Sequence, residues 1–157
     1  MPVILARIDD RLIHGQVTEG WCPKLKPEYI LVVSDDVAIS ELHSELCLAS
    51  LPSSLEGEIT GVDEAPGIIN MLDSNSRAAY VLFETPKDVY TVVKNGARLS
   101  RVNIGGMHST RGKREILDYI YVDDNDIRYL KGLVGLGVEL DFRDLPDHVN
   151  TDVMSRL

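Results

Sequence analysis

Short apolar runs alternate with segments of helical periodicity along nearly the whole chain, and this alternation limits the fold more than any other feature. The runs of strand length span residues 3–8, 29–34, 58–62, 78–84, 101–105, 116–122 and 138–142. Several are apolar throughout, as in strands that are buried on both faces of a sheet. Strands that alternate with helices are joined by right-handed crossovers. The sequence therefore predicts an α/β fold: an open, mostly parallel central sheet of about six or seven strands with helices on both faces.

Helical segments are expected between these strands. The first covers residues 15–21 and is expected to end at Cys22-Pro23, because the residue before a proline avoids the helical region. A later segment is amphipathic, with polar residues on one face and these apolar residues at helical spacing on the other: Ile39, Leu42, Leu46 and Ala49. No repeat, low-complexity segment or linker divides the sequence, so residues 1–157 are expected to form a single domain.

Composition restricts the function classes. Sixteen Lys and Arg against 25 Asp and Glu give a net charge of −9, which argues against a general nucleic-acid binder. No apolar run approaches the roughly 20 residues of a membrane span, and the N-terminus lacks the pattern of a signal peptide. Cys22 and Cys47 make neither a disulfide framework nor a zinc site, and the four histidines lie far apart. We therefore expect a cytoplasmic protein without a metal site.

Three of the predicted strands end in unusually polar residues. The segments are Asp9-Asp10-Arg11 with His14, then Ser34-Asp35-Asp36, and finally Gly105-Gly106-Met107-His108. The carboxyl ends of parallel strands meet at one edge of a sheet, where ligands bind in open α/β folds. The sequence thus predicts a cleft at that edge that holds histidines, arginines and carboxylates.

The residue types at the first strand end suit phosphoryl chemistry. A free imidazole has a pKa of about 6.5, so His14 can offer an unprotonated nitrogen to phosphorus near neutral pH. Arg11 presents a planar fork that matches phosphate oxygens. Asp9 or Asp10 could orient the imidazole, and Gly15 would let a phosphate approach the backbone at a helix start.

From these patterns alone, each of these residues also has a purely structural interpretation. These interpretations are a cap with a surface ion pair for Asp9-Asp10-Arg11, a helix-start cap for Asp35-Asp36, a tight turn for Gly105-Gly106 and a turn residue for His108.

The first motif also resembles a known signature. Residues 7–17 (Arg-Ile-Asp-Asp-Arg-Leu-Ile-His-Gly-Gln-Val), with Gly20-Trp21, look like the hallmark of the IIB component of the bacterial phosphotransferase system (PTS), mannose/fructose/sorbose family. Residues 34–38, 83–88 and 102–108 are similar to other segments of that family, and the likeness extends to about Phe142. Two departures are Ser109-Thr110-Arg111, where the family has an aromatic residue, and the tail, which keeps only Leu145-Pro146 of an expected pattern.

The resemblance implies a cytoplasmic phosphocarrier that associates peripherally with a membrane permease. Such a protein takes a phosphoryl group from a phosphohistidine of the IIA component and passes it to a sugar held by the IIC and IID components. The implied activity is that of a protein-N(pi)-phosphohistidine–sugar phosphotransferase. No metal or organic cofactor is implied, and members commonly associate as dimers.

The resemblance also assigns roles to residues. His14 falls on the phosphorylated position, Arg11 on the phosphate-stabilising arginine and Asp9 on an acidic neighbour. The further residues expected to bind substrate or phosphate are Arg7, Asp10, Gly15, Gln16, Asp35, Met107 and His108. Two other functions stay open: a regulatory IIB-like protein without sugar transport, and a small anion- or nucleotide-binding protein without turnover.

Overall fold

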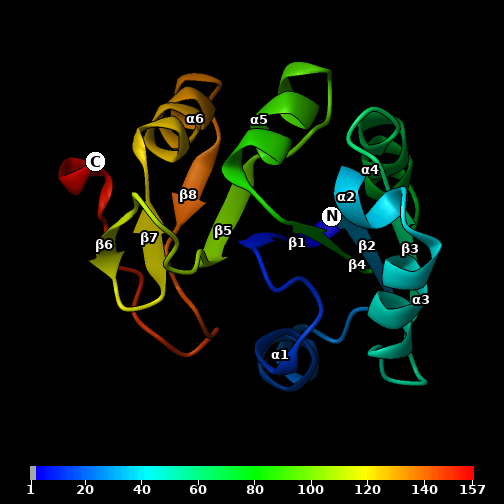
Figure 1. Ribbon diagram of the computed structural model, residues 1–157. Helices are drawn as coiled ribbons and strands as arrows, with labels where there is room; N and C mark the ends of the chain where they lie inside the picture. Colours follow the sequence, from blue (N-terminus) through cyan, green and yellow to red (C-terminus); the bar gives the residue numbers. More distant parts are fainter. Residues whose placement is uncertain (1–2) are drawn as a thin grey trace.

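The computed structural model, which describes residues 3–157, contains a six-stranded sheet in which all neighbouring strands run parallel (Figure 1). The strand order is β3-β2-β4-β1-β5-β8. The strands are β1 (Val3–Asp9), β2 (Tyr29–Val33), β3 (Glu56–Thr60), β4 (Ala79–Phe83), β5 (Arg101–Gly106) and β8 (Glu139–Asp141). This arrangement confirms the predicted α/β fold, and it puts the end of β1 near the middle of one sheet edge.

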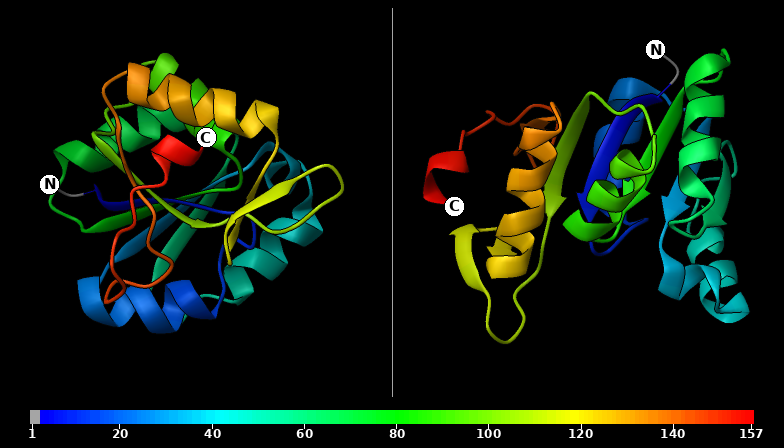
Figure 2. Two further views of the ribbon diagram at one scale, coloured as in Figure 1. Left: turned by 90° about the vertical axis from the view of Figure 1, so that its left-hand side faces the viewer. Right: turned by 90° about the horizontal axis from the view of Figure 1, so that it is seen from above.

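Both faces of the sheet are covered, which explains why the strands lack polar alternation. Leu31 and Val33 of β2 face one buried cluster, whereas Ile30 and Val32 face a second cluster on the other side. The first cluster lies under α4 (Ala65–Ser74), α5 (Pro86–Lys94) and α6 (Asp124–Gly135). The second lies under the π-helix η1 (Gln16–Trp21), α1 (Cys22–Leu25) and α3 (Glu41–Ala49), on the opposite face (Figures 1 and 2).

The first helical segment continues further than the sequence indicated. The expected end at Cys22-Pro23 is wrong, because η1 passes directly into α1, which runs to Leu25. Pro23 lies in the first turn of α1, directly after the π-helical turn, so the proline is accommodated where the hydrogen-bond pattern changes from η1 to α1. Lys26, with φ of 50° in the left-handed region, ends the helix instead. A π-helix is rare and often marks a functional site, so this start of the helical segment is notable.

The strand expected over residues 116–122 is also corrected. The segment forms a separate antiparallel hairpin of β6 (Arg114–Leu117) and β7 (Ile120–Val122), outside the six-stranded sheet. Exposed Asp118 lies at the turn, and buried Ile120 and Val122 join the first core cluster. The remaining strands lie within a few residues of their expected positions.

α3 packs on a different face from the one that its apolar spacing indicated. Ile39 lies outside α3, at the C-cap of the preceding helix, and it is exposed together with Leu42 and Leu46 of α3. The helix and its exit instead lie against Gly57 of β3, where an added Cβ would come 3.3 Å from Leu48 and 2.4 Å from Leu51. The missing side chain of Gly57 therefore lets the less obvious face of the helix approach the sheet.

The segment after β8 crosses the sheet edge towards α1. The Asp144 carbonyl accepts a hydrogen bond from the Trp21 indole at 2.9 Å, and Val153 is buried in the first core cluster. Short helices α2 (Asp35–Ala38) and η2 (Met154–Arg156) complete the structure. Among residues 3–157, no helix is long and apolar enough to cross a membrane.

Tyr80 provides a test of the packing under η1. Its hydroxyl donates a buried 2.7 Å hydrogen bond to the Trp21 carbonyl, and burial raises the pKa of this phenol. Tyr80→Phe should lower the free energy of unfolding by about 1 kcal/mol, since a buried hydrogen bond would be lost. Tyr29→Phe is the control, because its 2.6 Å bond to Glu58 is exposed, and it should cost less than about 0.5 kcal/mol in urea unfolding. Equal losses for the two variants would contradict this assignment.

Candidate functional site

The loop after β1 carries the candidate site at the carboxyl edge of the sheet. Strand β1 lies between β4 and β5, and the chain turns at Asp9, where the carbonyl accepts a 2.9 Å hydrogen bond from the Leu12 amide. Leu12 has φ of 57°, a left-handed conformation that costs energy for a bulky residue. Leu12 and Ile13 are buried in the second core cluster, and this burial holds the strained loop against the sheet. His14 follows directly at the start of η1.

The buried carboxylate of Asp9 is the centre of the site. Its Oδ2 accepts from Arg7 Nη2 at 2.9 Å and contacts His14 Nε2 at 2.8 Å. Its Oδ1 accepts from the backbone amide of Arg11 at 3.1 Å and from Arg11 Nε at 3.2 Å. Burial alone would raise the pKa of Asp9, but the hydrogen bonds from His14 and Arg11 and the charge of Arg7 outweigh it and hold this pKa well below its ordinary range. Asp9 is therefore an ionised acceptor at neutral pH.

The two nitrogens of His14 have different partners. An ionised carboxylate can only accept, so the contact with Asp9 assigns the ring proton to Nε2. Nδ1 then carries the lone pair, and it accepts a 3.3 Å hydrogen bond from the backbone amide of Gln16. The sequence left open whether Asp9 or Asp10 touches the ring, and the contact is made by Asp9.

Two arginines bind the same carboxylate in different environments. Arg7 is fully buried, and its guanidinium also donates to Asn103 Oδ1 at 2.8 Å and to the Asp144 carbonyl at 3.0 Å. The Arg11 side chain is 37% exposed and donates to Gln16 Oε1 at 2.7 Å. Arg7 was predicted to bind phosphate, but its guanidinium is fully buried, whereas that of Arg11 is partly exposed.

Gly105 and Gly106 make room for this cluster. A Cβ on Gly105 would lie 1.9 Å from the Arg7 guanidinium carbon, and one on Gly106 would lie 2.9 Å from Asp9 Oδ1. Both residues belong to strand β5, so the tight-turn interpretation does not apply. Their missing side chains allow the charged groups of β1 to lie flat against the neighbouring strand.

Asp10 connects the site to the loop after β5. Its carboxylate accepts a 2.7 Å hydrogen bond from the His108 amide and contacts His108 Nδ1. Predicted residue Met107 is buried, and its backbone bonds to Tyr119 and Tyr121 of the hairpin. Asp10 and His108 thus lie at the edge of the site, whereas Met107 supports the loop from below.

Of the remaining predicted residues, Gln16 belongs to the Asp9 cluster, whereas Gly15 and Asp35 make no hydrogen bond to it. Gln16 joins the cluster, since its Oε1 accepts from both Arg7 and Arg11. Gly15 has an ordinary helical conformation with φ of −54°, and an added Cβ would come no nearer than 3.9 Å to Glu19. Asp35 accepts from the Val62 amide at 2.8 Å, on the β3 side, and makes no hydrogen bond to the Asp9 cluster.

Asn103 and the 143–144 backbone were missed at the sequence level. Asn103 is a buried amide that donates to the Arg143 carbonyl at 2.8 Å while it accepts from Arg7. A polar residue within the apolar run 101–105 was the available signal for Asn103. The carbonyls of residues 143 and 144 carry no sequence signal, because any residue supplies a carbonyl.

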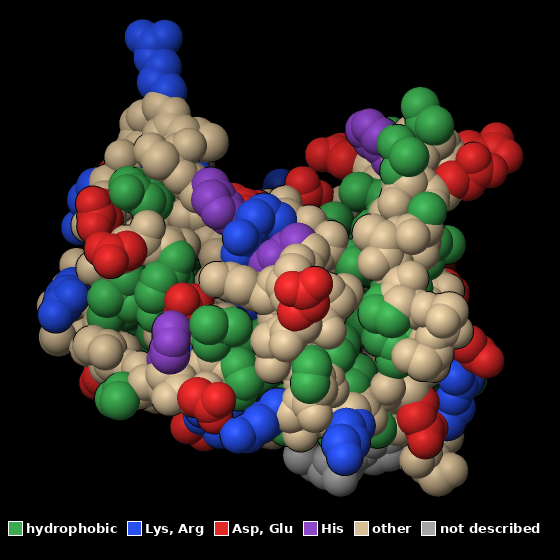
Figure 3. All heavy atoms as spheres, turned by 90° about the horizontal axis from the view of Figure 1, so that it is seen from below, with side chains coloured by type: hydrophobic (Ala, Val, Ile, Leu, Met, Phe, Trp, Pro, Cys, Tyr) green, Lys and Arg blue, Asp and Glu red, His purple; other side chains and the backbone are tan. Residues whose placement is uncertain are grey.

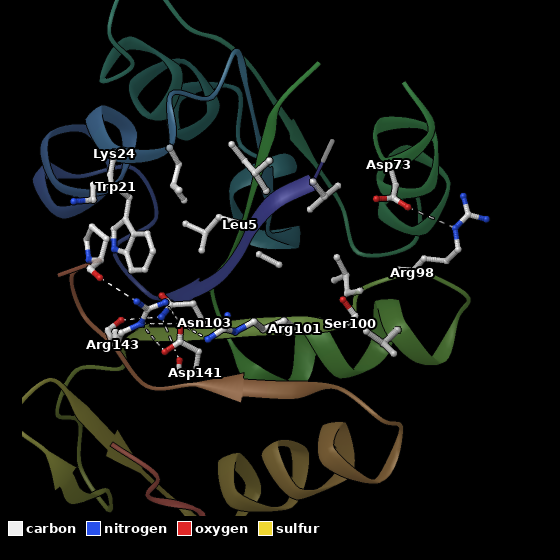
Figure 4. A pocket seen from close by; sticks show the side chains of 18 of the residues that line it. Leu5, Trp21, Lys24, Asp73, Arg98, Ser100, Arg101, Asn103, Asp141 and Arg143 are labelled. Atoms are coloured by element: carbon white, nitrogen blue, oxygen red, sulfur yellow. Dashed lines mark hydrogen bonds and ion pairs between the residues drawn. The ribbon is translucent and has the colours of Figure 1, made fainter. Parts of the chain in front are cut away.

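A cavity of about 880 Å³ lies between α1 and strands β1 and β5 (Figure 4). None of the predicted site residues lines it, and it meets the cluster only at Trp21, Asn103 and Arg143. Its charged side chains are already paired: Asp141 with Arg143 at 2.7 Å and Asp73 with Arg98 at 4.0 Å. The cavity is therefore separate from the site at His14. Among residues 3–157, no group of three His, Cys, Asp or Glu side chains is arranged to hold a metal ion.

Comparison with known proteins identifies the family. The family described as "PTS system sorbose subfamily IIB component" matches residues 3–157. The chain belongs to this family. It is 33% identical to the "PTS system fructose-specific EIIB component" of Bacillus subtilis (strain 168), over 100% of this chain and 96% of that protein. Membership makes the chain a component of a sugar phosphotransferase system, as the residues of the first motif indicated.

Further relatives agree with this IIB assignment. The crystal structure of the IIBSor domain of the sorbose permease from Klebsiella pneumoniae superimposes with a TM-score of 0.90 at 31% identity, covering 99% of this chain and 96% of that one. The "PTS system mannose-specific EIIAB component" of Escherichia coli (strain K12) is 35% identical over 143 residues, which are 91% of this chain and 44% of that protein. The fold and the family are therefore consistent with each other.

Arg7 is the first residue to test within the cluster. Arg7→Met should lower the free energy of unfolding at pH 7 by about 3–5 kcal/mol, because Asp9 would keep a buried charge with one cation fewer. The pKa of Asp9 is lowered in the folded protein, so its stabilisation is present above pH 4 and is lost as pH falls below that range. The loss caused by Arg7→Met should therefore shrink in urea unfolding at pH 3. The matched control is Arg101→Met, which removes a half-exposed arginine of strand β5 whose buried partner Asp141 also pairs with Arg143. An equal loss there would contradict the prediction.

Asp88 gives a pH-dependent test beside the site. Burial, with the charges of Glu84 and Asp35, raises the pKa of Asp88 to about 6. The folded protein therefore holds the Asp88 proton more tightly than the unfolded chain does. The resulting stabilisation is complete at a pH below the ordinary pKa of an aspartate, and it is lost as the pH rises through about 6. Asp88→Asn should therefore increase stability by about 1 kcal/mol at pH 7, allowing for partial exposure, and by less at pH 4. Exposed Asp118→Asn is the control in thermal unfolding, and a destabilised Asp88→Asn at pH 7 would contradict the prediction.

Proposed function

We propose that this chain is a phosphocarrier that accepts a phosphoryl group on His14 from a phosphohistidine of a IIA component. It then transfers this group to a sugar bound by the membrane IIC and IID components, as a protein-N(pi)-phosphohistidine–sugar phosphotransferase. The observation that carries the proposal is the His14 imidazole, whose Nε2 is held by buried Asp9 while Nδ1 keeps its lone pair. Family membership supports the same chemistry.

The first transfer step follows from these contacts. The Nδ1 lone pair of His14 forms a bond to phosphorus as the bond from phosphorus to the donor nitrogen breaks. The bonding electron pair returns to the donor imidazole. Asp9 stabilises the positive charge that develops on the His14 ring, as a carboxylate does for a histidine in acyl transfer. In the second step a sugar hydroxyl oxygen attacks phosphorus, its proton goes to solvent or a base, and the electron pair of the P–N bond returns to Nδ1.

Arg11 and the amide of Gln16 are proposed to hold the phosphoryl oxygens. The amide already points at Nδ1, so it is released to an oxygen once phosphorus occupies that nitrogen. Arg11 is partly exposed and supplies a charge that neutralises the group in transit. Asp10 and His108 are proposed to fix the adjoining loop, and Gly15 to leave space for the anion. Asp9 orients the ring, with Arg7 behind it.

The partners and location are part of the same proposal. The mannose relative from Escherichia coli is named as an EIIAB component, which supports a IIA domain as the donor. We place the chain in the cytoplasm, at the surface of a IIC/IID permease, without a cofactor of its own. The single domain, the homodimer implied by the family resemblance and the absence of a nucleic-acid partner are proposed on the same basis.

Phosphorylation of His14 is the direct test. Incubation with ³²P-labelled phosphoenolpyruvate, the general PTS proteins and a matching IIA component should label the protein through an acid-labile, alkali-stable bond. His14→Ala should abolish the label, and Arg11→Gln should slow labelling by roughly 100-fold, since a donor to the transition state is lost. His148→Ala, an exposed histidine in the C-terminal segment, should label normally.

Two outcomes would change the proposal. Undiminished labelling of His14→Ala would contradict the assignment of the acceptor. Normal labelling without transfer to any sugar, in membranes that contain IIC and IID, would favour the regulatory function instead.

A further inference from the structure

Three large apolar side chains are exposed on α3 and at the end of α2, directly before it. Ile39, the C-cap of α2, is 85% exposed, and Leu42 and Leu46, one turn apart on α3, are 64% and 61% exposed. We call these three residues the α3 ridge. Single exposed apolar residues are normal, but several that lie close together are typical of an interaction surface.

The α3 ridge lies next to the loop that carries His14. Cys47, on the inner side of α3, packs against the cluster that contains Leu12 and Ile13. Helix α2, which precedes Ile39, starts at the carboxyl end of β2, on the same sheet edge as Asp9. The α3 ridge therefore lies at the same edge of the sheet as the loop that carries His14.

The loop after β5 forms the opposite side of this surface. Residues 108–112 are exposed, and this loop is held to the site by the contact between His108 and Asp10. In Figure 3, a hollow at the carboxyl edge lies between two projections, with Lys or Arg and His side chains beside its floor. Apolar and acidic side chains gather on one projection, and a basic side chain forms the tip of the other. A macromolecule that brings phosphorus to His14 must enter this hollow and touch its walls.

The charges of the two walls differ. Exposed Glu41 and Glu45 accompany the α3 ridge on its helix, whereas Arg111 and Arg114 are exposed on the opposite side. The acidic flank is repelled by the anionic cytoplasmic surface of a membrane. A water-soluble partner therefore fits the α3 ridge better than a partner embedded in lipid.

We propose that the α3 ridge is the docking surface for the protein that carries the donor phosphohistidine, the IIA component. This inference rests on the proposed function, because it assumes that His14 receives its phosphoryl group from another protein. The donor should present an apolar patch with basic neighbours opposite α3, and acidic residues opposite Arg111. The ridge supplies contact area, and the unlike walls set the orientation of the donor.

Kinetics with two kinds of donor test the proposal. Leu42→Glu and the double variant Ile39→Ser/Leu46→Ser should raise the KM for phosphorylated IIA by about 10- to 100-fold. The kcat should change little, because these side chains bind the donor equally in the ground state and in the transition state. Labelling of His14 by phosphoramidate, a small donor that needs no docking surface, should be unchanged in the same variants. The controls are Met71→Glu and Val149→Glu, at residues 61% and 84% exposed on other parts of the chain.

The possible results separate the two proposals. The docking proposal would be overturned if the ridge variants retained the wild-type KM for phosphorylated IIA. It would also be overturned if the variants accepted phosphate from IIA normally but failed to deliver it to membranes that contain IIC and IID. Absence of labelling by either donor in the wild-type protein would overturn the proposed function. In that case, amide chemical-shift changes on adding unphosphorylated IIA still decide the docking question: changes centred on α3 support it, and changes elsewhere or none reject it.

Discussion

The buried carboxylate of Asp9 is the constraint on which the site depends. A single ionised group is bound by the guanidinium groups of Arg7 and Arg11 and by one nitrogen of His14. A buried charge is tolerated only when it is paired and hydrogen-bonded, so these contacts hold one another in place. The price of this burial is offset by the two arginines, of which only Arg11 reaches solvent.

The fold makes that arrangement possible through backbone positions more than through conspicuous side chains. The order of the parallel strands puts β5 beside β1, and Gly105 and Gly106 leave the space that Arg7 and Asp9 occupy. The carbonyls of residues 143 and 144 close the other side of the Arg7 guanidinium. The C-terminal segment thus reaches the site through a residue that never meets solvent.

The sequence was sufficient for the parallel sheet and for the core of the site, because both depend on local patterns. Apolar runs and polar strand ends located β1 and its loop, and the motif with His14 pointed to its family. The exposed face of α3 could not be predicted, since helical spacing shows that a helix has an apolar face but not whether that face is covered. The burial of Arg7 and the contribution of Asn103 depend on packing between strands distant in the chain.

The nitrogen of His14 that bonds to phosphorus tests the central claim most directly. Long-range ¹⁵N–¹H NMR spectra of the phosphorylated protein, with labelled histidine, distinguish the two ring nitrogens. Our account requires phosphorus on Nδ1 and a proton on Nε2, with the hydrogen bond to Asp9 retained. Phosphorus on Nε2, or on a residue other than His14, would contradict the role of Asp9 as the group that orients the ring.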